Sequence, residues 1–461
     1  MEKLKYNHGF ILWITLVSAM GGLLFGYDYV VIGGAKPFYE RFFDITSSPY
    51  LQGWAMSSAL IGCLFGALLS GYLSDRFGRK LPLITAACLF TIAAIGTGLV
   101  NQLTPFIIYR LIGGVGIGLA SAISPMYIAE ISPASMRGRL VSINQLTIVI
   151  GILAAQITNY LIAEKVPNGA TDEFILQSWN AQHGWRWMFW AGTLPASVFL
   201  ILSFLIPESP RYLVKVGKTG QASAILTRIG GKHYALKEEK EIANTLLGAE
   251  SRIDWRMLTS GNIRPILILG IVLAIFQQWC GINVIFNYAE EIFTSAGYSV
   301  GDMLFNIVIT GTVNLLFTFV AMRMVDSWGR RKLMLLGSAG LALIYLMLGA
   351  SYFFELKGMA ILILVLMAIA SYSMTLAPIT WVVLSEIFPN SVRGAAMAVA
   401  TTALWIACFV LTYTFPILNK MLNASGTFWL YAFICLAGFI YILRVLPETK
   451  GMSLEEIEKQ Q

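Results

Sequence analysis

The sequence predicts an all-α membrane protein of twelve transmembrane helices, arranged as two similar halves of six. Three observations lead to this prediction. The 461 residues are 57% hydrophobic and only 12% charged, about half the charged fraction of a soluble domain. Twelve segments are apolar over the roughly 20 residues that a helix needs to cross a bilayer. Motifs in the first six of these segments recur in the last six.

The first six predicted spans form an N-terminal bundle over residues 1–206. The first span follows the short segment MEKLKYNHGF and has no small-residue cleavage site. We therefore expect this span to be retained and not removed as a secretory signal. The six spans are residues 9–33, 51–73, 81–100, 105–128, 140–162 and 186–206.

A polar stretch, residues 207–262, separates the two sets of spans. It contains LVKVGKTGQASAILTRIGG and YALKEEKEIANTLLGAESR, which predict short, charged helices at the membrane surface. A C-terminal bundle is predicted over residues 263–446 and a tail over residues 447–461. The last six spans are residues 264–291, 302–325, 331–352, 359–385, 395–416 and 427–446.

The distribution of basic residues predicts the orientation. One set of alternate loops contains Arg76, Arg79, Lys80, Arg137, Arg139, the 207–262 stretch, Arg323, Arg330, Arg331, Lys332 and Arg393. The other set has few, namely Lys36, Arg41, Lys165, Lys357 and Lys420. Basic loops remain in the cytoplasm, so both termini and the 207–262 stretch are predicted to be cytoplasmic in a bacterial inner (plasma) membrane. The net charge of +7 then reflects topology and not a nucleic-acid surface.

The two halves repeat charged motifs. SDRFGRK, which ends at Lys80, matches VDSWGRRK, which ends at Lys332. YIAEISPASMRGRL matches VLSEIFPNSVRGAA, so that Glu130 corresponds to Glu386 at the same offset as Arg137 to Arg393. Duplicated halves around a central segment are typical of carriers that work by alternating access.

The seventh span contains a cluster of carboxamides in the stretch FQQWCGINVIFNY, residues 276–288. They are Gln277, Gln278, Asn283 and Asn287. An unpaired amide in lipid costs several kcal/mol, so these groups face protein, water or a ligand. Either other helices surround this span, or it breaks near Gly281. Uncharged donors and acceptors suit a polyol such as a sugar, although the amides could also serve only to hold helices together.

Other kinds of chemistry are not supported by the sequence. The cysteines Cys63, Cys88, Cys280, Cys408 and Cys435 lie inside predicted spans without a metal-ligand or CxxC spacing. The three histidines are far apart in the sequence, and no nucleophile constellation or nucleotide-binding loop is present. We therefore expect neither an enzyme nor a cofactor.

Several motifs together resemble one family. They are GGLLFGYD (21–28), DRFGRK (75–80), RLIGGVGIGLA (110–120), PESPRYL (207–213), FQQWCGIN (276–283), WVVLSEIFPNSVRG (381–394) and PETKG (447–451). The chain resembles the sugar porters of the major facilitator superfamily from about residue 21 to 454, and most closely the bacterial D-xylose–proton symporters. The resemblance implies the major facilitator fold, with two six-helix bundles that rock about a sugar site at the middle of the membrane.

The resemblance also implies a set of sugar-binding residues. Amides hydrogen-bond hydroxyls in pairs, and an indole face packs on the C–H face of a pyranose. For the tryptophans, the alternative is an anchoring role at the membrane interface. The matching positions are Gln277, Gln278, Asn283, Asn314, Trp381 and Trp405, with Phe25 as a further candidate.

Four positions depart from the xylose symporters. Their fifth-span glutamine is Ile152 here, although Gln156 lies one turn further along the same face. Leu404 replaces a glutamine, Asn287 a tyrosine and Ala377 a glycine. A ligand with an unmatched polar group binds less well by about 1–3 kcal/mol. Pentose, hexose, inositol and deoxysugar therefore all remain open as substrates.

A carboxylate deep in the first span, Asp28, is the candidate for proton coupling. An intramembrane acid needs a partner or titrates, and Arg110 in the fourth span is the expected partner. Family members with an aspartate here couple transport to protons, whereas passive facilitators typically have asparagine. A sixth-span acid implicated in symport is Gly192 in this chain, which weakens the inference. The alternative is a fixed structural ion pair.

The repeated charges are expected to form a cytoplasmic gate that links the bundles when the inner side is closed. The expected pairs are Asp75 with Arg79, Glu130 with Arg137, Asp326 with Arg330, and Glu386 with Arg393. The resemblance adds Glu208, Arg211 and Glu448. The alternative is that these charges serve only topology.

The sequence therefore predicts a secondary active transporter that imports a monosaccharide, xylose-like, with protons. Its expected partners are the sugar, the proton and the lipid bilayer, with no nucleic acid and no obligate protein partner. The alternatives are a passive sugar or polyol facilitator and a sugar sensor that transports nothing.

Overall fold

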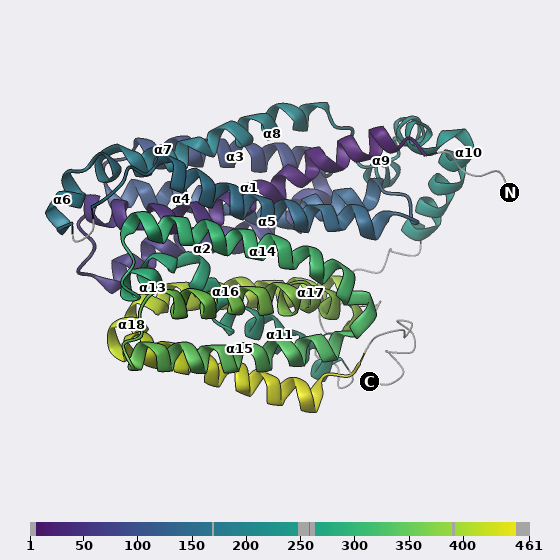
Figure 1. Ribbon diagram of the computed structural model, residues 1–461. Coiled ribbons are helices and arrows are strands. Elements are labelled where there is room, and N and C mark those ends of the chain that lie inside the picture. The colour runs from purple at the N-terminus through teal and green to yellow at the C-terminus, as the bar shows by residue number, and fades with distance from the viewer. Residues whose placement is uncertain (1–5, 168–169, 248–257, 259–262, 390–391, 449–461) are drawn as a thin grey trace.

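A computed structural model describes residues 6–167, 170–247, 258, 263–389 and 392–448, apart from the side chains of 245–247, 325–327 and 385. These residues are helical almost throughout and contain no β-strand. Two stacked bundles make up the molecule, one from the first half of the chain and one from the second (Figure 1). The beginning of α1 (His8–Phe42) and the end of α18 (Arg393–Val445) lie at the same end of the molecule as α10 (Thr219–Leu247), and α6 (Asp172–Gln177) lies at the opposite end.

The first bundle contains the six predicted spans. Its helices are α1 (His8–Phe42), α2 (Pro49–Phe77), α3 (Lys80–Leu99), α4 (Leu103–Ile131), α5 (Arg137–Ile162), α6 (Asp172–Gln177), the π-helix η1 (Asn180–Gly184), α7 (Trp185–Ala191) and α8 (Thr193–Leu205). Side chains of Asn7 and Ser48 cap α1 and α2 by accepting hydrogen bonds from first-turn N–H groups. α1 continues well beyond the predicted end at residue 33, because the charged residues that follow are paired inside the protein.

The described part of the linker forms two helices. α9 spans Pro210–Lys215 and α10 spans Thr219–Leu247. α10 is interrupted at Gly231, whose φ of 83° belongs to the left-handed region that glycine tolerates. The interruption separates the two charged segments read from the sequence. The rest of the linker lies outside the described residues, apart from Leu258.

The second bundle repeats the first with more breaks. Its helices are α11 (Arg264–Trp279), α12 (Ile282–Asn287), α13 (Ala289–Ser295), α14 (Val300–Trp328), α15 (Arg330–Phe353), α16 (Met359–Met374), α17 (Leu376–Ile387) and α18 (Arg393–Val445). The predicted seventh span breaks at Gly281, where φ is 87°. The predicted tenth span breaks at Thr375, three residues before Pro378.

The structure contains eleven apolar helical segments long enough to cross a membrane within its described residues. The last of these, α18, has 53 residues, about 80 Å at 1.5 Å per residue, which is far longer than one crossing of a bilayer core needs. Its backbone breaks at Asn423, where φ is 57° and ψ is 176°. The two arms of α18 match the eleventh and twelfth predicted spans, so the prediction of twelve crossings is confirmed.

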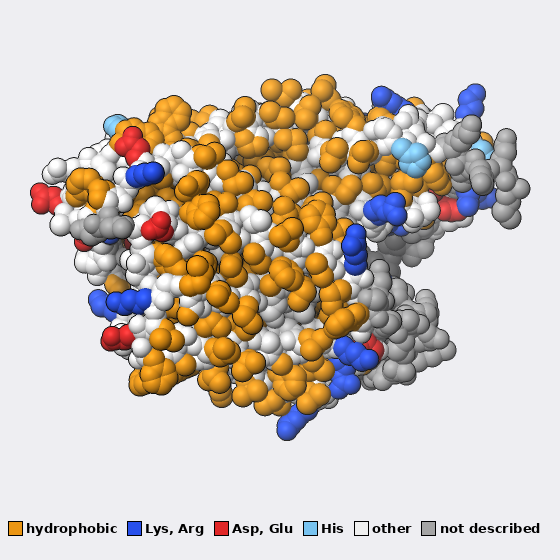
Figure 2. All heavy atoms as spheres, viewed as in Figure 1, with side chains coloured by type: hydrophobic (Ala, Val, Ile, Leu, Met, Phe, Trp, Pro, Cys, Tyr) orange, Lys and Arg blue, Asp and Glu red, His pale blue; other side chains and the backbone are white. Residues whose placement is uncertain are grey.

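The two bundles meet along two seams. α2 packs against α18, and α5 packs against α14. Gly53 of α2 lies directly against the Tyr413 carbonyl of α18, where a larger residue would not fit. Figure 2 shows apolar side chains covering the middle of this face across both bundles, with charged side chains gathered at the two ends. This distribution fits a bilayer around the middle of the molecule.

Candidate functional site

The break at Gly281 places the carboxamides of the seventh span inside the protein. Gln277 and Gln278 end α11, while Asn283 and Asn287 lie on α12. All four are buried, between 3% and 9% exposed. The sequence left two outcomes open for this span, enclosure by other helices or a break near Gly281, and the structure combines them.

These amides form one hydrogen-bonded network. The Gln277 side chain donates to the Ala377 carbonyl at 3.3 Å, and Gln278 donates to the Gln277 amide oxygen at 3.2 Å. Asn283 donates to the Gln278 amide oxygen and approaches the Cys408 sulfur at 3.9 Å. The network lies at the junction of α11, α12, α17 and α18, and it offers uncharged polar atoms in an apolar interior.

Tyr29 extends this network into the first bundle. Its hydroxyl accepts a hydrogen bond from the Asn287 amide at 3.2 Å and lies 3.6 Å from the Cys408 sulfur. The sequence reasoning missed both Tyr29 and Cys408. One signal was available, because Tyr29 lies four residues after Phe25 and therefore on the same face of α1.

The aromatic candidates differ in their contacts and in their exposure. The Phe25 ring lies 6.0 Å from the Trp405 ring across the two bundles and 6.1 Å from the Tyr29 ring. Trp405 is 5% exposed, whereas Trp381 is 39% exposed. Phe25 and Trp405 therefore join the amide network at the bundle interface, and Trp381 presents an accessible indole on α17.

Two further amide candidates lie on helices at the α5–α14 seam. Asn314 of α14 is buried and accepts a hydrogen bond from the Ser373 hydroxyl at 2.7 Å. Gln156 of α5 is 1% exposed and packs its amide oxygen against Gly311 of α14. Both polar atoms of the Gln156 amide lack a hydrogen-bond partner among the described residues. Nearby, the departures Ile152 and Leu404 are buried apolar side chains.

The predicted ion pair of Asp28 with Arg110 is present. The Arg110 guanidinium donates to the Asp28 carboxylate at 2.8 Å and to its backbone carbonyl at 3.3 Å. One carboxylate oxygen of Asp28 is thereby paired. The other is buried and has no hydrogen-bond partner among the residues that the structure describes.

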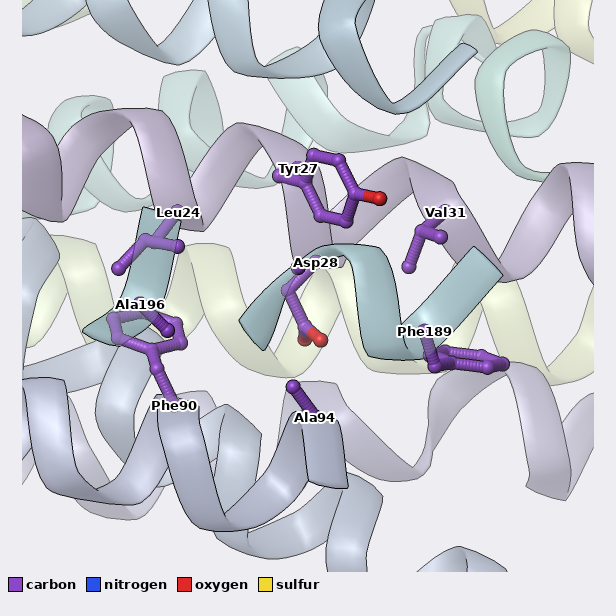
Figure 3. Close-up of a pocket in the computed structure, with 9 residues that line it drawn as sticks. Leu24, Tyr27, Asp28, Val31, Phe90, Ala94, Phe189 and Ala196 are labelled. Carbon is purple, nitrogen blue, oxygen red and sulfur yellow. The ribbon is translucent and has the colours of Figure 1, made fainter. Parts of the chain in front are cut away.

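A small cavity adjoins Asp28 inside the first bundle. Figure 3 shows the carboxylate directed towards Ala94 of α3, with Phe90 and Phe189 on either side. Gly192 also lines the cavity. The space holds about one water molecule, which is the ordinary partner of a buried polar atom that protein groups leave unpaired.

Asp28 and the sugar-site residues occupy different faces of α1. Phe25 and Tyr29 are one turn apart and face the second bundle. Leu24, Asp28 and Val31 face the cavity inside the first bundle. At about 100° per residue, the side chains of Asp28 and Tyr29 diverge by roughly a quarter turn although the residues are consecutive.

A charged cluster joins the bundles at the α6 end. The Lys36 ammonium of α1 lies 3.1 Å from Glu290 and 2.8 Å from Glu291, both on α13. It also lies 3.3 Å from Glu40 on its own helix. Lys36 is 2% exposed, and Asn419 of α18 donates to Glu291. We call these four charged residues the outer lock, after the orientation that the basic loops predict. The sequence analysis recorded Lys36 only as a loop charge.

At the α10 end, the charges of the first bundle pair differently from the sequence-based expectation. Arg79 bonds Glu130 at 2.7 Å and not Asp75, which pairs with Lys215 at 2.9 Å. Glu208 accepts from the backbone N–H of Arg79 at 2.8 Å. The α2–α3 turn brings Arg79 to the end of α4, where Glu130 lies. Arg137 and Arg211 are exposed.

The second bundle repeats this arrangement. Arg330 bonds Glu386 at 3.0 Å, and Glu448 accepts from the backbone N–H of Arg330 at 2.9 Å. Arg393 donates to the Phe388 carbonyl at 3.1 Å. These contacts lie within one bundle, as those of Arg79 do. The side chain of Asp326 lies outside the described residues.

Two similar helical bundles around a buried, uncharged polar site are the architecture of a membrane carrier. Sequence comparison identifies the family. Residues 14–460 match the family described as "Sugar (and other) transporter". The chain belongs to this sugar transporter family, and the predicted family is confirmed.

Two relatives and one solved structure extend the comparison. The chain is 40% identical over 456 residues to the arabinose–proton symporter of Bacillus subtilis (strain 168), covering 99% of this chain and 96% of that protein. It is 38% identical over 484 residues to the D-xylose–proton symporter of Escherichia coli (strain K12), covering 98% and 96%. The structure resembles the inward-open conformation of the xylose transporter XylE from E. coli with a TM-score of 0.85, 37% identity and coverage of 98% and 99%. The predicted major facilitator fold is confirmed.

Proposed function

We propose that the protein imports a monosaccharide together with protons by alternating access. The observation that carries this proposal is the Asp28–Arg110 ion pair beside a buried amide network at the bundle interface. The likeness to the arabinose–proton and D-xylose–proton symporters supports it.

The sugar is recognised by the amide network and its aromatic neighbours. Amides bind hydroxyl groups as donor and acceptor together, and the absence of charge in the network favours a neutral polyol over a sugar phosphate. The proposed contacts are Gln277, Gln278, Asn283, Asn287, Asn314, Trp381, Trp405, Phe25 and Gln156. Gln156 would have to leave its contact with Gly311 to reach a ligand, since its amide is fully buried here.

Proton coupling rests on the unequal environments of the two Asp28 oxygens. One oxygen accepts a hydrogen bond from the Arg110 guanidinium at 2.8 Å. The unpaired oxygen faces a cavity that holds about one water, through which a proton reaches the group. Protonation removes the ion pair and leaves Arg110 free to move, so the charge on Asp28 sets how tightly α1 is held to α4.

The α10 end is assigned to the cytoplasm, with both termini and the 207–262 linker. The proposed domains remain 1–206, 207–262, 263–446 and 447–461 in a plasma membrane. The basic loops support this orientation. The likeness to an inward-open transporter and the outer lock across the bundles support an inward-facing state.

The cytoplasmic gate is proposed to close through the charged ends of both bundles. In each, an arginine, a carboxylate of the fourth or tenth span, and a glutamate that binds the arginine backbone form a compact unit. These units would meet when the protein faces outward. The proposed gate residues are Asp75, Arg79, Glu130, Arg137, Glu208, Arg211, Asp326, Arg330, Glu386, Arg393 and Glu448.

One observation favours a passive facilitator as the second candidate. Among the described residues, Asp28 is the only carboxylate that lines its cavity, and Gly192 supplies no second acid there that would pass the proton onward. In a facilitator, Asp28 and Arg110 would form a permanent structural pair.

Uptake by purified protein in liposomes distinguishes the two candidates. Liposomes loaded at neutral pH are diluted into acid buffer with labelled xylose, arabinose, glucose, galactose, fucose, rhamnose or inositol. Accumulation above equilibrium that collapses with a protonophore supports symport and identifies the sugar. Uptake that only reaches equilibrium supports the facilitator.

A further inference from the structure

Two tyrosines flank Asp28 on α1, and their hydroxyls bond to different bundles. Tyr27 donates to the Met188 carbonyl of α7 at 3.0 Å, inside the first bundle. Tyr29 bonds Asn287 of α12 and Cys408 of α18, both in the second bundle. The residue after the coupling carboxylate thus reaches directly into the candidate sugar site.

The chemistry of the groups fixes the direction of one of these hydrogen bonds. The Asn287 amide nitrogen only donates, so the Tyr29 oxygen is the acceptor of that bond at 3.2 Å. In the second bond, between the Tyr29 hydroxyl and the Cys408 sulfur at 3.6 Å, either group can be the donor. The same sulfur receives the Asn283 amide at 3.9 Å. Tyr29 is therefore hydrogen-bonded into the amide network and does not only pack against it.

Tyr29 differs from the other members in its attachment. Gln277, Gln278 and Asn283 bond one another or atoms of their own bundle. The Tyr29 hydroxyl connects the network to α1, the helix that Arg110 anchors through Asp28. Because consecutive residues of a helix move together, a shift of α1 when Asp28 loses its charge moves the Tyr29 hydroxyl as well.

We infer that Tyr29 is a positioning residue that transmits the protonation state of Asp28 to the sugar-binding amides. With Asp28 ionised, the hydroxyl holds Asn287 and Cys408. With Asp28 protonated and α1 released, the hydroxyl withdraws, and Asn287 becomes available to a sugar hydroxyl. The inference rests on the proposed proton-coupled transport and names a residue through which that coupling acts.

Tyr29→Phe tests the inference, because it removes only the hydroxyl and keeps the ring against Phe25. The matched control is Tyr288→Phe. Tyr288 follows Asn287 directly, is fully buried, and donates to the Thr412 carbonyl at 2.7 Å within the second bundle. Both variants lose one hydroxyl near the same amide, but only the first loses a bond between the bundles.

Three measurements are made on each protein in liposomes, with the labelled sugar that gives the highest uptake in the assay described under the proposed function. They are accumulation driven by a pH gradient, exchange of sugar at equal concentrations without a gradient, and the dependence of the half-saturating sugar concentration on pH. Tyr29→Phe is expected to exchange sugar but to accumulate it poorly. The sugar concentration that half-saturates this variant should differ from that of the wild type by about 2- to 13-fold, which corresponds to the free energy of one hydrogen bond. This concentration should vary little with pH. Tyr288→Phe should retain accumulation and the wild-type pH profile.

The possible outcomes separate this inference from the proposed function. If the wild type accumulates sugar and Tyr29→Phe matches it in accumulation and pH profile, the inference about Tyr29 is overturned and symport stands. If both tyrosine variants lose coupling equally, the effect comes from general packing, and the inference is again overturned. A wild type that never accumulates sugar overturns the proposed function and the inference together.

Discussion

Replacement of Lys36 by methionine is expected to open the outer side of the protein. Methionine keeps the length of the side chain and removes the charge. The ammonium is the cation in direct contact with Glu40, Glu290 and Glu291, at 2.8 to 3.3 Å. Without it, carboxylates from α1 and α13 face one another across the bundle interface and repel.

The magnitude follows from the burial of the cluster. Removing one member of a buried ion pair costs about 3–5 kcal/mol. Glu290 and Glu291 retain 13% and 20% side-chain exposure, so water solvates part of the charge that is left. We therefore expect the closed outer side to lose about 2 kcal/mol of stability relative to the open one. This corresponds to roughly a 30-fold change in the ratio of the closed to the open state.

The native Cys408 reports the change. It is 2% exposed at the amide network, and a membrane-impermeant thiol reagent added outside reaches it only when the outer side opens. In a background with the other four cysteines replaced by alanine, Lys36→Met should raise the rate of outside labelling by about 30-fold. Lys165→Met, at an exposed lysine near the same end, should leave it unchanged. Equal labelling of Lys36→Met and the wild type would refute the assignment of the outer lock.

Three further predictions concern the ion pairs and the backbone. Asp28→Asn should abolish accumulation of sugar in a pH gradient but retain exchange of sugar without one, as measured in liposomes. Arg79→Ala removes the cation that pairs with Glu130 and leaves that carboxylate only its hydrogen bond from the Ser209 hydroxyl among its side-chain contacts in the described residues. This should destabilise the protein by about 3 kcal/mol, seen as a lower thermal unfolding midpoint in detergent, whereas Arg76→Ala at an exposed arginine should leave the midpoint unchanged. Asn423→Gly should raise the same midpoint, since a non-glycine residue at φ 57° and ψ 176° costs about 1–3 kcal/mol. An unchanged or lower midpoint would contradict strain at Asn423.

The sequence predicted the fold well because membrane helices are defined by local composition. Twelve apolar segments are recognisable from composition. The glycine among the carboxamides of the seventh span indicates a break near Gly281 as one of two outcomes, and the helix does break there. The end of α1 was predicted too early. Lys36 and Glu40 look like loop residues in the sequence, but tertiary ion pairs keep them in the helix.

The site was predicted less completely, because its details depend on contacts between distant parts of the chain. The arginine and glutamate motifs were recognised, yet their partners were sought among neighbours, whereas Arg79 bonds Glu130 from another helix. Tyr29 and Cys408 are ordinary residues of apolar spans until the bundles bring them to Asn287. Gln156 shares the face of Ile152 on the fifth span, which makes it a candidate for the role of the missing amide. Helical periodicity could not reveal that its amide packs against Gly311.

The most direct test of proton-coupled sugar import measures both solutes at once. Liposomes containing the purified protein and a trapped pH indicator, with equal pH on both sides, receive a transported sugar outside. Potassium and valinomycin prevent a membrane potential from opposing proton movement. The account predicts that sugar influx acidifies the lumen and that Asp28→Asn takes up sugar without acidification. Sugar influx into wild-type liposomes at constant internal pH would contradict it and would leave the Asp28–Arg110 pair as a structural feature of a facilitator.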